Sequence, residues 1–121
     1  MIQLQNNNYD LETRTLKFSQ NLILFLKKLP NSQILIPLIN QCLRSGTSIG
    51  ANYREANGAS SKKDFISKIY ICKKESKETL YWLELIEQSL NDEKLKFECR
   101  ILWQESKEFV LIFGKISSKS V

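Results

Sequence analysis

The sequence predicts an all-α protein consisting of a single up-down-up-down antiparallel four-helix bundle. Apolar residues recur at alternating steps of four and three in four separate segments, which is the spacing of one face of an amphipathic helix. Turns of only a few residues join the segments, and short connections favour antiparallel neighbours. A chain of 121 residues fits one domain. We therefore expect the bundle at residues 9–116, between disordered tails at residues 1–8 and 117–121.

The first predicted helix begins after an Asn-rich N-terminus and spans about twenty residues. Asp10 stands where an N-cap is expected. Pro30 ends the segment, because a proline disfavours helical backbone in the residue before it. The stripe that we expect to face the core is Leu11, Thr15, Phe18, Leu22, Phe25 and Leu29.

Two starts are open for the second predicted helix. Asn31 or Ser32 can open it, whereas Pro37 is tolerated only in a first turn, which moves the start to about residue 36. The pair Asn57-Gly58 supplies its C-terminal stop. The core stripe is Leu35, Ile39, Cys42, Gly46, Ile49, Tyr53 and Ala56.

Capping residues also mark the third and fourth predicted helices. Ser61 and Asp64 form a capping box with Asp in place of Glu, and Asn91-Asp92 separates the two helices. Their stripes are Phe65, Ile69, Cys72, Ser76, Thr79, Leu83, Ile86 and Leu90, then Leu95, Cys99, Leu102, Ser106, Phe109, Phe113 and Ile116. Small residues near the middle of three stripes predict a thin waist: Gly46, Ser76 and Ser106.

Composition excludes several classes of function. The chain has no histidine, which removes Ser-His-Asp and Cys-His nucleophile systems and the usual helical zinc and di-iron motifs. An enzyme that uses only carboxylates is not excluded by composition. The acidic residues, however, are scattered along the amphipathic helices, as is typical of a solvent-exposed face. Three cysteines, Cys42, Cys72 and Cys99, lie on core stripes and indicate buried thiols in a reducing compartment. We therefore expect no enzyme activity, no metal and no cofactor.

Charge and hydropathy indicate where the protein acts. A formal net charge of +5 and a pI near 9.2 favour acidic partners such as nucleic acid, although many ordinary soluble proteins show a similar mild excess. The N-terminus has no signal-peptide pattern, and no apolar run reaches the ~18 residues needed to cross a bilayer. We expect a cytoplasmic protein without a membrane partner.

The second predicted helix carries a second, polar series roughly 110° from its apolar stripe. This series is Gln41, Ser45, Ser48, Asn52 and Glu55. The third helix has a comparable series, Lys68, Ile71, Glu75, Glu78, Trp82 and Leu85, with Tyr81 beside it. We expect the two seams to meet, with Arg44 pairing with Glu75 or Glu78. The alternative is that the small polar residues are simply exposed.

Lysines crowd the first half of the third predicted helix, where the helix dipole disfavours positive charge. They are Lys62, Lys63, Lys68, Lys73, Lys74 and Lys77. With Arg54 they form the candidate nucleic-acid-binding residues; the alternative is a solvated charged face. Stacking aromatics are not evident, so we expect contacts to the phosphate backbone. Apolar residues beside the core stripes, including Tyr81, Trp82 and Leu85, favour self-association, unless they only widen the core.

Three stretches of the sequence resemble one bacterial family. They are Gln41-Cys-Leu-Arg-Ser-Gly-Thr-Ser-Ile-Gly-Ala-Asn-Tyr-Arg-Glu-Ala56, Asp64-Phe-Ile-Ser-Lys68 and Lys74-Glu-Ser-Lys-Glu-Thr-Leu-Tyr-Trp-Leu-Glu-Leu85. They resemble the four-helix bundle proteins often encoded in intervening sequences of large-subunit ribosomal RNA genes. The resemblance implies a homopentamer. That family is in turn similar to the accessory variability determinant of diversity-generating retroelements, a basic pentamer that binds nucleic acid and a reverse transcriptase.

The resemblance also implies roles for individual positions. Arg44, Ser48, Asn52 and Glu55 match the signature of the family's second helix, and Glu75, Glu78 and Trp82 match that of its third. It implies structural or assembly roles for them, which we extend to Gln41, Tyr81 and Leu85. The departures from the family pattern are Cys42, Cys72 and a short loop at residues 30–33.

The leading hypothesis is a non-enzymatic oligomer that binds RNA or DNA, or a ribonucleoprotein, with a reverse-transcriptase-like or ribosomal protein as a further partner. The alternative is a structural or protein-interaction scaffold with no nucleic-acid role. An all-helical ribonuclease that pairs an arginine with a downstream histidine is excluded by the absence of histidine.

Overall fold

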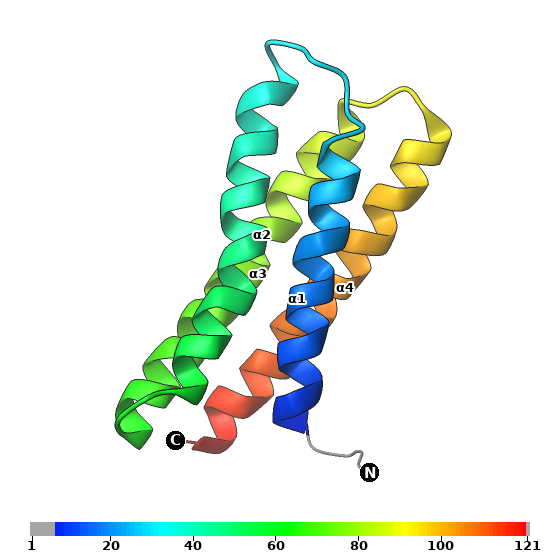
Figure 1. The fold of residues 1–121 in the computed structure, drawn as a ribbon. Helices are drawn as coiled ribbons and strands as arrows, with labels where there is room; N and C mark the ends of the chain where they lie inside the picture. Colours follow the sequence, from blue (N-terminus) through cyan, green and yellow to red (C-terminus); the bar gives the residue numbers. More distant parts are fainter. Residues whose placement is uncertain (1–6, 121) are drawn as a thin grey trace.

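The computed structural model describes residues 7–120, with side chains from residue 11 to residue 119. Within these limits the chain forms four helices: α1 (Asn7–Leu26), α2 (Leu35–Asn57), α3 (Lys62–Gln88) and α4 (Glu93–Ser120). Consecutive helices run in opposite directions, so α1 begins at the end of the bundle where α4 finishes (Figure 1). The predicted all-α, up-down-up-down four-helix bundle is confirmed.

The backbone of each helix lies close to those of two neighbours. Across the diagonal, the ring of Tyr53 on α2 meets that of Phe113 on α4, with centroids 5.6 Å apart. The pairs α2–α3 and α3–α4 are closely packed, whereas α1 and α4 touch least. Most stripe residues form the core, with Leu22, Ile49, Ile69 and Phe113 among its fully buried side chains. The core also contains Leu26, which no stripe included, whereas four stripe residues are only partly buried against it: Ile39, Phe65, Leu95 and Ile116. None of the described helices is long and apolar enough to cross a membrane.

The predicted waist is present in the middle of the bundle. Ser76 and Ser106 are fully buried, and Ser106 Oγ donates a hydrogen bond to the Ser76 carbonyl oxygen at 3.0 Å, which joins α4 to α3. Gly46 of α2 is buried too, and it lies directly against Leu22 and Phe18 of α1. Small side chains at these positions therefore allow the helix axes to approach one another.

Both ends of α1 differ from the predictions, whereas α2 begins at Leu35, close to the later of its two open starts. Helix α1 already includes Asn7, so Asp10 lies inside the helix and is not its N-cap; residues 1–6 of the predicted tail lie outside the described part. The helix ends at Leu26, before a tighter turn in which Leu29 N donates to Leu26 O at 3.2 Å. Ser32 Oγ accepts a hydrogen bond from Leu35 N at 3.0 Å, so Ser32 caps the turn that leads into α2.

The later boundaries agree better, with one correction. Ser61 Oγ accepts from Asp64 N at 3.0 Å, which confirms the predicted cap of α3, and α2 ends at Asn57 as expected. The predicted disordered tail at residues 117–121 is wrong for residues 117–120, because α4 continues to Ser120. Ser117 is buried and its Oγ donates to Gly114 O at 3.1 Å, so this last turn is held by packing. Val121 lies outside the described residues.

Candidate functional site

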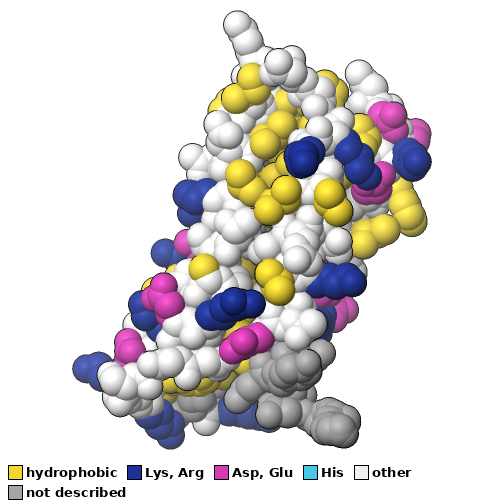
Figure 2. Space-filling model, in the orientation of Figure 1, with side chains coloured by type: hydrophobic (Ala, Val, Ile, Leu, Met, Phe, Trp, Pro, Cys, Tyr) yellow, Lys and Arg dark blue, Asp and Glu magenta, His cyan; other side chains and the backbone are white. Residues whose placement is uncertain are grey.

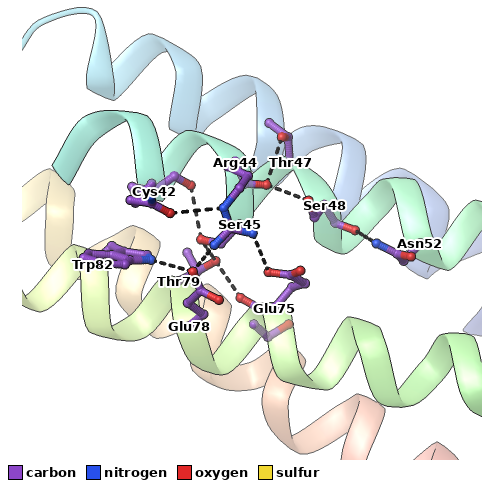
Figure 3. A network of polar contacts seen from close by, with 12 residues as sticks. Cys42, Arg44, Ser45, Thr47, Ser48, Asn52, Glu75, Glu78, Thr79 and Trp82 are labelled. Carbon is purple, nitrogen blue, oxygen red and sulfur yellow. Dashed lines mark hydrogen bonds and ion pairs between the residues drawn. The ribbon is translucent and has the colours of Figure 1, made fainter. Parts of the chain in front are cut away.

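A polar network joins α2 to α3 on one side of the bundle (Figure 3). Arg44 Nη1 lies 3.3 Å from Glu75 Oε1, and its Nη2 donates to Glu78 Oε2. Arg44 Nε also donates to Gln41 Oε1 at 3.1 Å. The predicted meeting of the two seams is therefore confirmed, and Arg44 pairs with both glutamates instead of one.

A buried hydroxyl pair lies directly beneath this network. Ser45 Oγ and Thr79 Oγ1 are 2.8 Å apart, and both residues are fully buried. Thr79 Oγ1 also lies 2.7 Å from Glu75 O and Ser45 Oγ lies 3.4 Å from Cys42 O, so either hydroxyl can be the donor within the pair. Both hydroxyl groups are thereby satisfied, and their small side chains let α2 and α3 pack closely. We call the residues Gln41, Arg44, Ser45, Glu75, Glu78 and Thr79 the α2–α3 seam.

Ser48 and Asn52 do not extend the seam as predicted. Ser48 Oγ donates to Arg44 O at 2.6 Å, and Asn52 Nδ2 donates to Ser48 O at 2.8 Å, so both turn back onto their own helix (Figure 3). Short polar side chains often bond the carbonyl one turn earlier. Glu55 does reach α3, where it pairs with Lys68 at 2.9 Å; this hydrogen bond raises the pKa of Lys68.

The three aromatic and apolar candidates of α3 have different surroundings. Trp82 packs against the core, and its Nε1 donates to Glu78 Oε2 at 2.9 Å. Leu85 is half-buried. Tyr81 is 56% exposed, and its ring centroid lies 5.0 Å from that of Trp82 in an edge arrangement. For Trp82 the alternative of a widened core stripe is therefore correct, whereas Tyr81 projects into solvent.

The seven basic candidates do not form one patch. Lys62, Lys63, Lys74 and Lys77 are exposed, and no ion pair is recorded for them among residues 11–119. The other three lie apart from these: Lys68 pairs with Glu55, Lys73 lies along Gly114 of α4, and the exposed Arg54 lines a hollow between α1 and α2. The expected single cluster is thus reduced to four free lysines of α3.

Sequence reasoning missed Tyr70. This side chain is 49% exposed and belongs to the same helix as the four free lysines. The sequence did contain a signal for it. Tyr70 is seven residues after Lys63 and eleven before Tyr81, and both spacings place residues on nearly the same face of a helix. The sequence made no stacking aromatic evident, and Tyr70 is an exposed ring beside the candidate lysines.

The cysteines fill the core, as predicted. Cys42, Cys72 and Cys99 are at most 1% exposed, and burial raises the pKa of each thiol to about 12. They stay protonated at neutral pH and are poor nucleophiles. Within the described part of the chain, no group of three or more Cys, Asp or Glu side chains is placed to hold a metal ion.

Comparisons with known proteins give a consistent result. A model of the 23S rRNA-intervening sequence protein family matches residues 7–97. A crystal structure from Bacteroides thetaiotaomicron VPI-5482, described as a protein with unknown function from the S23 ribosomal protein family, is similar over 88% of this chain and 96% of its own. The two chains are 37% identical and superpose with a TM-score of 0.76. No match is found among curated proteins.

Proposed function

The chain belongs to the 23S rRNA-intervening sequence protein family, and we propose that it is a non-enzymatic, oligomeric bundle that binds nucleic acid or a ribonucleoprotein through a basic surface. The observation that carries this proposal is a set of four exposed lysines on α3 that have no ion pair among residues 11–119: Lys62, Lys63, Lys74 and Lys77. An ammonium group without a carboxylate partner is free to replace the counterions of a phosphate backbone. The family name supports ribosomal RNA or its proteins as the partner.

Nucleic-acid binding should depend on salt and on these lysines. We expect affinity for RNA and DNA to fall steeply with salt concentration, because each phosphate contact releases counterions. Changing Lys62, Lys63, Lys74 and Lys77 together to Glu should abolish binding and flatten the salt dependence, as measured by fluorescence anisotropy. The matched control changes four exposed lysines outside α3, Lys27, Lys94, Lys107 and Lys115, to Glu and alters the net charge equally.

Two outcomes would contradict this part of the proposal. If the unmodified protein binds neither RNA nor DNA at low salt, the scaffold alternative is correct. If both quadruple variants lose affinity equally, binding follows overall charge and the α3 lysines are not a specific surface.

Assembly is the second part of the proposal, and it is supported by apolar surface around α1. Figure 2 shows apolar side chains gathered over the upper half of the bundle, where the C-terminal half of α1 faces the viewer. Leu24 is 58% exposed and Ile101 55%, and both line a groove between the loosely packed helices α1 and α4. A neighbouring groove lined by Ile101 has a volume of about 530 Å³. Exposed apolar patches of this kind often mark interfaces.

The expected assembly is a homopentamer, which is a proposal from the resemblance. Light scattering of the unmodified protein should give about five times the 14.1 kDa chain mass. The double change Leu24→Glu and Ile101→Glu should produce monomers, because charges would be buried in the interface. Leu111→Glu is the control, since Leu111 is 63% exposed on α4 but does not line the described grooves. A protein that is monomeric at every concentration would exclude assembly.

A further inference from the structure

One face of α3 carries exposed tyrosines interleaved with free lysines. At 100° per residue, Lys63, Tyr70, Lys74, Lys77 and Tyr81 fall within a narrow arc of the helix. All five are exposed. Tyr70 and Tyr81 are separated by about 16 Å along the axis, with two of the lysines between them. We call these five residues the α3 outer stripe.

The three lysines give the stripe a positive charge, and the acidic side chains of the second half of α3 have other partners. Glu78 is bound by Arg44 and Trp82, Glu87 pairs with Arg100 at 2.7 Å, and Glu84 accepts a hydrogen bond from Trp103 Nε1 at 2.8 Å. These contacts draw the carboxylates of the second half of α3 towards α2 and α4. The lysines of the stripe are left without a described carboxylate partner.

The α2–α3 seam also positions one of the two tyrosines. Arg44 pairs with Glu78, and Glu78 accepts the indole N–H of Trp82 (Figure 3). The indole held in this way contacts the ring of Tyr81, with centroids 5.0 Å apart. An aromatic ring that is already oriented before binding loses less conformational entropy when a ligand stacks on it. The α2–α3 seam therefore helps to orient the exposed ring of Tyr81 before a ligand binds.

We infer that the α3 outer stripe is a binding track for single-stranded nucleic acid, in which Tyr70 and Tyr81 stack on unpaired bases while Lys63, Lys74 and Lys77 contact the phosphates. Proteins that bind single strands without reading sequence combine a basic surface with aromatic rings in this way. Every base offers a stacking face, so the track should tolerate different sequences. A duplex cannot use the tyrosines, because its bases are already stacked and paired.

This inference rests on the proposed function and sharpens it from nucleic acid in general to single strands. It predicts two separable contributions. The lysines should contribute to the affinity for both single strands and duplexes, whereas the tyrosines should contribute to the affinity for single strands only.

The test measures affinity for an unstructured RNA of about 12 nucleotides and for a duplex of the same length, at one low salt concentration. Tyr70→Ala and Tyr81→Ala should each weaken single-strand binding by about tenfold and leave duplex binding unchanged. Tyr70→Phe and Tyr81→Phe keep the rings and should retain the original affinity. Lys63→Glu with Lys74→Glu and Lys77→Glu should weaken both.

The possible failures can be told apart. If the alanine variants bind the single strand as tightly as the unmodified protein while the lysine variant does not, the stacking track is wrong and the basic surface stands. If the alanine variants lose duplex and single-strand binding equally, stacking is again excluded. If the unmodified protein binds neither ligand, both the track and the proposed function are overturned.

Discussion

Replacing Gly46 with leucine is expected to destabilise the bundle by about 3 kcal/mol. A Cβ atom at Gly46 would overlap Leu22 Cδ2 and would lie 3.6 Å from Phe18 Cε2. Leu22 is fully buried and Phe18 is 2% exposed, so neither side chain can move into solvent. The inserted side chain must push α1 away from α2 or force buried rotamers out of their minima. Denaturant unfolding monitored by circular dichroism measures the loss.

Gly114 of α4 provides a matched control for this change. It is also a glycine inside a helix, but the three atoms nearest to a Cβ there all belong to the flexible side chain of Lys73, the first at 3.6 Å. Gly114→Leu should therefore be neutral or stabilising, because leucine is the better helix former by up to about 1 kcal/mol. Equal destabilisation by Gly46→Leu and Gly114→Leu would show that the waist is not sterically limited.

A second-site change tests the same contact from the opposite side. Leu22→Ala alone should cost about 2–5 kcal/mol through the cavity that it leaves. Combined with Gly46→Leu, it provides space for the new side chain, so the double variant should lose at least about 1 kcal/mol less than the two single losses together. Additive losses would contradict direct contact between these two positions.

The heptad stripes were sufficient to predict the fold, because burial of an amphipathic face is what stabilises each helix. The helix ends were less predictable. Pro30 marks a boundary in the sequence, but the tightened turn before it depends on local hydrogen bonds that propensity does not specify. The last turn of α4 has the composition of a disordered tail, and only the packing of Ser117 against the bundle reveals that it is helical.

The candidate site was predictable where charge and spacing agree. Arg44 of α2 pairs with Glu75 and Glu78 of α3. Opposite charges on two facing helices attract each other, so this pairing could be predicted from charge and spacing. Ser48 and Asn52 show the same periodicity, but a short side chain can satisfy itself on its own helix, and periodicity cannot distinguish the two outcomes. The six lysines are close in sequence, yet 100° of rotation per residue leaves only Lys63, Lys74 and Lys77 together on the α3 outer stripe.

Replacing Arg44 with methionine is the second change with a large expected effect, a loss of about 2 kcal/mol of unfolding free energy. Methionine keeps the apolar stem and removes the charge, which leaves Glu75 without its guanidinium. The Glu75 side chain is only 11% exposed, so water cannot fully replace the lost partner. Arg44 itself is 47% exposed, which keeps the loss below that of breaking a fully buried ion pair.

The cost should come from the unpaired charge of Glu75, and two variants test that cause. Arg100→Met breaks an exposed pair with Glu87 and should cost no more than about 1 kcal/mol, because water compensates both groups. Adding Glu75→Gln to Arg44→Met removes the uncompensated charge while keeping the shape of the side chain, so stability should rise above that of Arg44→Met alone. If the second change gives no recovery, the loss arises elsewhere, in the Gln41 or Glu78 contacts of Arg44. Recovery would instead show that the Glu75 carboxylate lowers stability when Arg44 is absent. The α2–α3 seam would then favour the packing of α2 against α3 in which these two charges are paired.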